Sequence, residues 1–125
     1  MNNNKKKILV IEDEATLQKA LSDILIREGY DVINATDGTL GLSLARSENP
    51  DLILLDIILP GMDGFEILRN IKEKDKSQVP IIILTNLSDL NDIQKALDIG
   101  ATTYLVKADF HLDDVLKKVK DVLIK

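Results

Sequence analysis

Three acids, one hydroxyl and one lysine in this chain stand at the ends of short apolar runs, and together they suit phosphate chemistry. Carboxylates that lie close together repel one another unless a cation neutralises them, and Mg²⁺ prefers oxygen ligands of this kind. A lysine and a hydroxyl beside such a metal suit an anion such as phosphate, which one of the carboxylates could attack as a nucleophile. The five residues are Glu12, Asp13, Asp56, Thr85 and Lys107.

These residues can act together only if the apolar runs lie side by side in one sheet. Each run is short and rich in aliphatic residues, and each is followed by a longer segment whose apolar residues recur at helical spacing. Right-handed β-α-β crossovers place helices on both faces of a parallel sheet, and ligands bind where its strands end. Strands are expected at 8–11, 31–35, 52–55, 81–84 and 103–106.

Apolar stripes predict the helices that follow these strands. A helix is expected at about 39–46, where the position between two strands outweighs a strand-like alternation of leucines. His111, the only histidine, precedes the last helix and is expected to be a surface or capping residue. The other stripes are Leu17–Leu25, Phe65–Ile71, Leu90–Leu97 and Leu112–Leu123.

The overall composition limits the classes of protein to which this chain can belong. Its 125 residues suit one domain, and 16 basic against 21 acidic residues give a net charge of −5. That balance argues against nucleic acid or an anionic membrane as the main partner, and the lack of Cys excludes disulfides and Cys-based zinc sites. The apolar run at 8–11 is too short for a signal peptide or a membrane span, so a cytoplasmic protein without membrane insertion is expected.

Four stretches, in this order, resemble the receiver domain of two-component response regulators, and the resemblance covers essentially the whole chain. It implies a flavodoxin-like, doubly wound α/β/α sandwich with a five-stranded parallel sheet in the order 2-1-3-4-5. It also implies one chemotaxis-regulator-like receiver domain over 1–125, with residues 1–6 as a flexible tail. The matching stretches are Ile8–Glu14, Asp56–Gly64, Ile83–Thr85 and Gly100–Lys107.

The resemblance gives the charged residues specific roles. Asp56 resembles the acceptor of a phosphoryl group from a histidine kinase or a histidine phosphotransfer protein. Lys107 is similar to the lysine that pairs with that phosphoryl group. The resemblance also implies a site for Mg²⁺ or Mn²⁺. Its ligands would be the side chains of Glu12, Asp13 and Asp56 and the backbone carbonyl of Ile58.

The resemblance also implies how the phosphorylated state is sensed. Thr85 resembles the hydroxyl residue drawn to the phosphate, and Tyr104 resembles the aromatic residue that turns inward when Thr85 moves. In the family this reshapes the surface of the fourth helix, fifth strand and fifth helix, where partners bind. The implied function is a phosphorylation-activated signalling switch, not an enzyme beyond its own phosphorylation and dephosphorylation. Its kinase and its downstream protein are not named by the sequence, and a monomer and a phosphorylation-linked homodimer both stay open.

Four positions depart from the family pattern or modulate its chemistry. Ala108 stands where the family usually has Pro, joined to the lysine by a cis peptide bond. A cis bond is costly before a residue other than Pro, so the resemblance does not fix the direction in which the Lys107 side chain points. Asn86 stands where a small residue is commoner and is expected to narrow access to the phosphate. Ile58 and Leu87 are apolar and hold no attacking water, which predicts slow self-dephosphorylation.

Other functions fit some of the same residues. A degenerate receiver that acts as a phosphorylation-independent scaffold is favoured only by Ala108. An aspartate-nucleophile phosphatase of the haloacid dehalogenase type needs a second Asp where Ile58 stands. A flavodoxin needs a hydroxyl-rich phosphate loop where Glu12–Glu14 stand, and Asp13 taken by itself would be interpreted as a helix cap.

Overall fold

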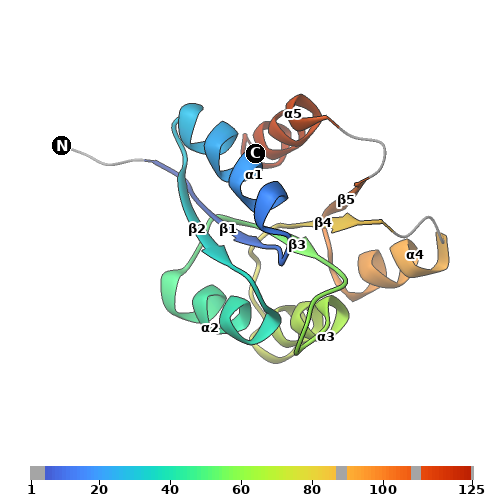
Figure 1. Cartoon of the computed structure of the whole chain (residues 1–125). Helices are drawn as coiled ribbons and strands as arrows, with labels where there is room; N and C mark the ends of the chain where they lie inside the picture. Colours follow the sequence, from blue (N-terminus) through green and yellow to red (C-terminus); the bar gives the residue numbers. More distant parts are fainter. Residues whose placement is uncertain (1–4, 87–89, 108–110, 125) are drawn as a thin grey trace.

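A five-stranded parallel sheet lies between two layers of helices, as the sequence predicts (Figure 1). The computed structural model describes residues 5–86, 90–107 and 111–124. The strands are ordered β2-β1-β3-β4-β5 across the sheet. The elements are β1 (Lys7–Ile11), α1 (Ala15–Arg27), β2 (Asp31–Ala35), α2 (Gly38–Glu48), β3 (Leu52–Asp56), α3 (Gly64–Arg69), the π-helical turn η1 (Asn70–Lys74), β4 (Ile81–Thr85), α4 (Leu90–Ile99), β5 (Thr103–Val106) and α5 (Leu112–Leu123).

The core is divided between the two faces of the sheet. Ile8 and Val10 of β1 pack with α1 and α5 on one face, and Leu9 and Ile11 pack with α2, α3 and α4 on the other (Figure 1). Every residue of β3 and β4 is buried, which explains why these strands consist almost entirely of Ile and Leu. The aliphatic runs therefore form the centre of the sheet, and their ends are held rigidly.

The strand registers bring the predicted site residues to one edge. Ile11 is paired with Leu55, so Glu12 emerges beside Asp56. On the other side of β3, Thr85 is paired with Val106, and the backbone N–H of Lys107 donates to the carbonyl of Thr85 at 2.7 Å. The carboxyl ends of β1, β3, β4 and β5 thus meet where the sequence places them.

The second and fourth helices are both present, and each differs from expectation in one detail. The second helix is confirmed, and it extends beyond the expected 39–46 at both ends; Asp37 caps its start by accepting the N–H of Leu40 at 2.8 Å. The apolar stripe of α4 is wrong at Leu90, which is 75% exposed, whereas Ile93 and Ala96 enter the core. None of the helices formed by the described residues has both the length and the apolar character needed to span a membrane.

Two further features concern the N-terminal tail and the start of α3. Residues 5–6 are exposed and form no helix or strand, and residues 1–4 of the expected tail lie outside the described residues. At the start of α3, a Cβ on Gly64 would lie 2.5 Å from Cα of Ile57 and 2.9 Å from the carbonyl oxygen of Asp56. Only glycine lets α3 begin this close to the end of β3.

Candidate functional site

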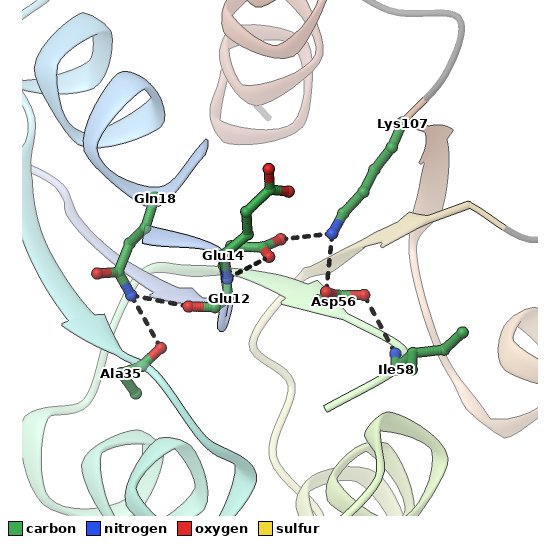
Figure 2. A network of polar contacts seen from close by, with 7 residues as sticks. All are labelled: Glu12, Glu14, Gln18, Ala35, Asp56, Ile58 and Lys107. Atoms are coloured by element: carbon green, nitrogen blue, oxygen red, sulfur yellow. Dashed lines mark hydrogen bonds and ion pairs between the residues drawn. The ribbon is translucent and has the colours of Figure 1, made fainter. Parts of the chain in front are cut away.

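A single lysine joins two buried acids at the edge of the sheet (Figure 2). Nζ of Lys107 lies 2.8 Å from Oδ2 of Asp56 and 2.8 Å from Oε1 of Glu12. The other carboxylate oxygen of Asp56 accepts the backbone N–H of Ile58 at 3.1 Å. Asp56 is 4% exposed and Glu12 is fully buried, so both carboxylates depend on these few partners.

The electrostatics of Glu12 and Lys107 follow from this burial. Burial raises the pKa of Glu12 above its usual value and the charge of Asp56 raises it further, against the contacts with Lys107 and the N–H of Glu14. Burial also lowers the pKa of Lys107, but its contacts with Asp56 and Glu12 outweigh burial and raise that pKa overall. The lysine is therefore a permanent cation at neutral pH.

Three carboxylates converge here and fit a divalent metal ion. Glu12, Asp13 and Asp56 each offer one oxygen, and these oxygens lie within 4.8 Å of one another. Among the described residues, Oε1 of Glu12 is a buried oxygen without a well-aligned hydrogen-bond donor, although Nζ of Lys107 is close to it. Three acids against one ammonium leave an excess of negative charge, which suits a hard cation such as Mg²⁺.

The two acids after β1 are held by the start of α1. Oε2 of Glu12 accepts the N–H of Glu14 at 2.9 Å, and Glu14, not Asp13, is the residue that precedes the helix. The helix-cap interpretation of Asp13 is therefore wrong, and its carboxylate is free to serve the acidic cluster. Gln18 of α1 donates to the carbonyl of Glu12 at 3.0 Å, a contact that the sequence interpretation missed because it involves backbone oxygens.

The other predicted site residues lie around this cluster. Thr85 ends β4 and is 2% exposed. Tyr104 of β5 is half-buried and packs against the core on the α2, α3 and α4 face. Asn86 is exposed and lines the same groove as Lys107 and His111.

Of the four expected modulating positions, the structure places Asn86 and Ile58 but not the other two. Leu87 and Ala108 lie outside the described residues, and so does the geometry of the peptide between Lys107 and Ala108. The side chain of Ile58 is 59% exposed beside Asp56. His111 is exposed, and its backbone N–H donates to Oδ2 of Asp114 at 2.9 Å, which confirms it as a surface residue at the start of α5.

Known proteins resemble this chain over nearly its whole length. The family described as the response regulator receiver domain matches residues 8–120. The sporulation initiation phosphotransferase F of Bacillus subtilis (strain 168) is 36% identical over 118 residues, which cover 94% of this chain and 94% of that protein. The probable transcriptional regulator ycf27 of Porphyridium aerugineum is 41% identical over 119 residues, which cover 95% of this chain and 48% of that protein.

Solved structures share the fold. A chain of the CheX-CheY-BeF3-Mg²⁺ complex from Borrelia burgdorferi superposes with a TM-score of 0.87 at 32% identity, covering 96% of this chain and 90% of that one. The lengths of the sequence relatives differ more. This chain spans about half the length of the curated transcriptional regulators that it matches, and nearly all of the phosphotransferase.

Proposed function

This chain belongs to the response regulator receiver domain family, which works in phosphorylation-dependent two-component signalling, and we propose that it is a switch phosphorylated on Asp56. Receiver domains interact with histidine kinases or phosphotransfer proteins, so the proposed donor is a phosphohistidine of such a partner. One observation carries the proposal. The buried carboxylate of Asp56 lies between the ammonium of Lys107 and the N–H of Ile58, beside two further acids.

The proposed transfer uses the carboxylate of Asp56 as the nucleophile. One of its oxygens attacks phosphorus, an O–P bond forms, and the P–N bond of the phosphohistidine breaks with its electron pair left on the imidazole nitrogen. Lys107 is the cation already next to Asp56, and we propose that it pairs with the negative phosphoryl oxygens. The hydroxyl of Thr85, at the neighbouring strand end, is proposed to donate to one of these oxygens.

The proposed cofactor is Mg²⁺ or Mn²⁺. Its ligands would be the carboxylates of Glu12, Asp13 and Asp56 with the backbone carbonyl of Ile58, and the grouping of the three carboxylates supports this set. When bound, the ion would neutralise charge on the phosphoryl oxygens. The solved complex of a CheY protein with BeF3 and Mg²⁺ supports the same choice.

The proposed output is a change in partner binding. Thr85 and Tyr104 would couple the phosphate to the surface formed by α4, β5 and α5, where a downstream protein binds. Receiver domains are not enzymes in the usual sense, and this one would at most catalyse its own phosphorylation and dephosphorylation. The proposed location is the cytoplasm, and the acidic chain is not proposed to bind nucleic acid directly. A phosphorylation-linked homodimer is compatible with this output, as is a monomer.

Intact-mass measurement tests the proposal. The protein is incubated with Mg²⁺ and a small acyl or amido phosphate, and the expected result is the addition of one phosphoryl group. The matched control is Asp56→Asn, which keeps the shape of the side chain and removes the nucleophilic carboxylate, so it should gain no mass. No addition to the wild-type protein under any condition would overturn the switch and favour the scaffold. Turnover of many phosphate esters would favour the phosphatase.

A further inference from the structure

Gln18 lies near the start of α1 and joins the ends of two strands (Figure 2). Its Nε2 donates to the carbonyl oxygens of Glu12 and Ala35, each at 3.0 Å. The same carbonyl of Ala35 accepts the backbone N–H of Glu12 at 3.0 Å. One side-chain amide thus uses both of its N–H donors to tie β1, β2 and α1 together.

The carbonyl that Gln18 holds belongs to the peptide unit between Glu12 and Asp13. A peptide unit is planar, so fixing its C=O also fixes the Cα atoms from which Glu12 and Asp13 carry their side chains. Asp13 is exposed, and its carboxylate depends on the backbone for its position. The amide of Gln18 is therefore attached to the one rigid unit that both acids share.

We propose that Gln18 is a positioning residue for the metal-binding acids. Its amide sets how the carboxylates of Glu12 and Asp13 face that of Asp56, without itself touching a metal or a phosphate. The inference rests on the proposed function, because it assumes that these three acids hold Mg²⁺. Groups that orient metal ligands often change metal affinity by about tenfold or more, so the effect is measurable.

The variant Gln18→Met tests the inference, because Met keeps the length of the side chain and has no N–H donor. MgCl2 is titrated into the intact protein by calorimetry, and stability is measured separately by urea unfolding without Mg²⁺. The expected result is weaker binding, with an Mg²⁺ dissociation constant about tenfold larger than that of the wild-type protein. Phosphorylation of Asp56 should slow at limiting Mg²⁺ and return close to the wild-type rate at saturating Mg²⁺.

Ser22→Ala is the matched control. Ser22 also ties α1 to β2, since its hydroxyl donates to Oδ1 of Asn34 at 3.0 Å, but it does not touch the peptide between the two acids. It should lower the stability and leave the Mg²⁺ affinity unchanged. The shorter variant Gln18→Ala, which leaves room for water at both carbonyls, gives the same comparison if Gln18→Met does not fold.

The outcomes separate the inference from the function on which it rests. Wild-type Mg²⁺ affinity in the Gln18 variants, or an equal loss of affinity in Ser22→Ala, would overturn the positioning role and leave the switch intact. A wild-type protein that binds no Mg²⁺ would overturn the proposed metal site, and this inference with it.

Discussion

The ammonium of Lys107 lies 2.8 Å from Oδ2 of Asp56, and the same ammonium is 2.8 Å from Oε1 of Glu12. Two buried carboxylates at the ends of different strands therefore share one counter-charge. A buried ion pair that loses one partner leaves an uncompensated charge, which costs more than the pair contributes. The resting site thus contains its own cation, with which a metal ion must compete for the carboxylate oxygens.

Replacing Lys107 by Met should destabilise the metal-free protein and strengthen its binding of Mg²⁺. The loss of the shared counter-charge should lower the free energy of unfolding by about 3 kcal/mol. The site also becomes more negative, so Mg²⁺ should restore more stability in the variant than in the wild-type protein. Urea unfolding at neutral pH with and without MgCl2 measures both effects.

The control for this change is Lys120→Met. It removes an exposed ion pair in which Nζ of Lys120 lies 2.6 Å from Oε2 of Glu28. Exposed pairs contribute little, so this variant should keep the wild-type response to Mg²⁺. An Mg²⁺ response of Lys107→Met equal to that of the wild-type protein would contradict the view that lysine and metal compete for the same oxygens.

Lys72 should make the stability depend on pH in alkaline solution. Its Nζ donates to the carbonyls of Ser77 and Val79, and burial lowers its pKa from the usual 10.5. Between the lowered pKa and 10.5 the folded state binds fewer protons than the unfolded state, so the free energy of unfolding rises with pH in that window. Below the window this contribution is at its minimum, because the buried amine is charged in both states.

Comparison with Lys72→Met isolates this contribution from all other titrating groups. The free energy of unfolding of the wild-type protein minus that of the variant should increase as the pH rises from the lowered pKa of Lys72 to 10.5. Urea unfolding at several pH values supplies the difference. A constant difference over that range would show that Lys72 titrates in the folded protein as it does in the unfolded chain.

Most of the sheet could be predicted because local composition decides it. Strands that are covered on both faces must be apolar at every position, and β3 and β4 show this directly. Leu90 was misassigned because helical spacing gives a stripe but not its orientation against the sheet. The π-helical turn ends in a bond from the N–H of Asp75 to the carbonyl of Asn70, which no periodicity reveals.

The candidate site was predictable to the extent that strand ends define it. Parallel strands end at one edge, so Glu12, Asp56 and Lys107 could be brought together from their positions after apolar runs. Gln18 could not be found in this way, because its partners are backbone carbonyls whose positions depend on the folded register. A polar residue on the inner side of the first helical turns was the available signal.

Gly64→Ala should disturb both the stability and the site. Its Cβ would lie 2.5 Å from Cα of Ile57 and 2.9 Å from the carbonyl oxygen of Asp56, so the backbone has to shift. Such overpacking costs about 1–3 kcal/mol, and phosphorylation of Asp56 should slow because β3 and α3 separate. Unfolding measurements and intact-mass time courses check the two effects.

Gly29→Ala separates the crowding effect from the general cost of losing a glycine. Gly29 has φ +101°, and a Cβ there would meet nothing within 4 Å. The strain of a positive φ should cost about 1 kcal/mol, with no change in the phosphorylation rate. A normal rate in Gly64→Ala would show that the end of β3 tolerates the displacement.

Ile58→Asn should shorten the lifetime of the phosphorylated protein. Ile58 is 59% exposed, and its backbone N–H is bonded to Asp56, so its side chain would stand beside the proposed acyl phosphate without a group that binds water. An amide there can hold an attacking water, and decay should become several-fold faster. The stability should change little, because the side chain is largely in solvent.

Ile26→Asn makes the same change at an aliphatic side chain of similar exposure, 56%, on α1. It should leave the decay rate unchanged, since it stands outside the acidic cluster. The rate is measured by intact mass after removal of the phosphate donor. Fast decay of the wild-type protein, unaltered by polar substitution at both Ile58 and Leu87, would refute the expectation of slow self-dephosphorylation. Slow decay that Ile58→Asn accelerates and Ile26→Asn does not would assign the rate to the side chain two residues after the acceptor.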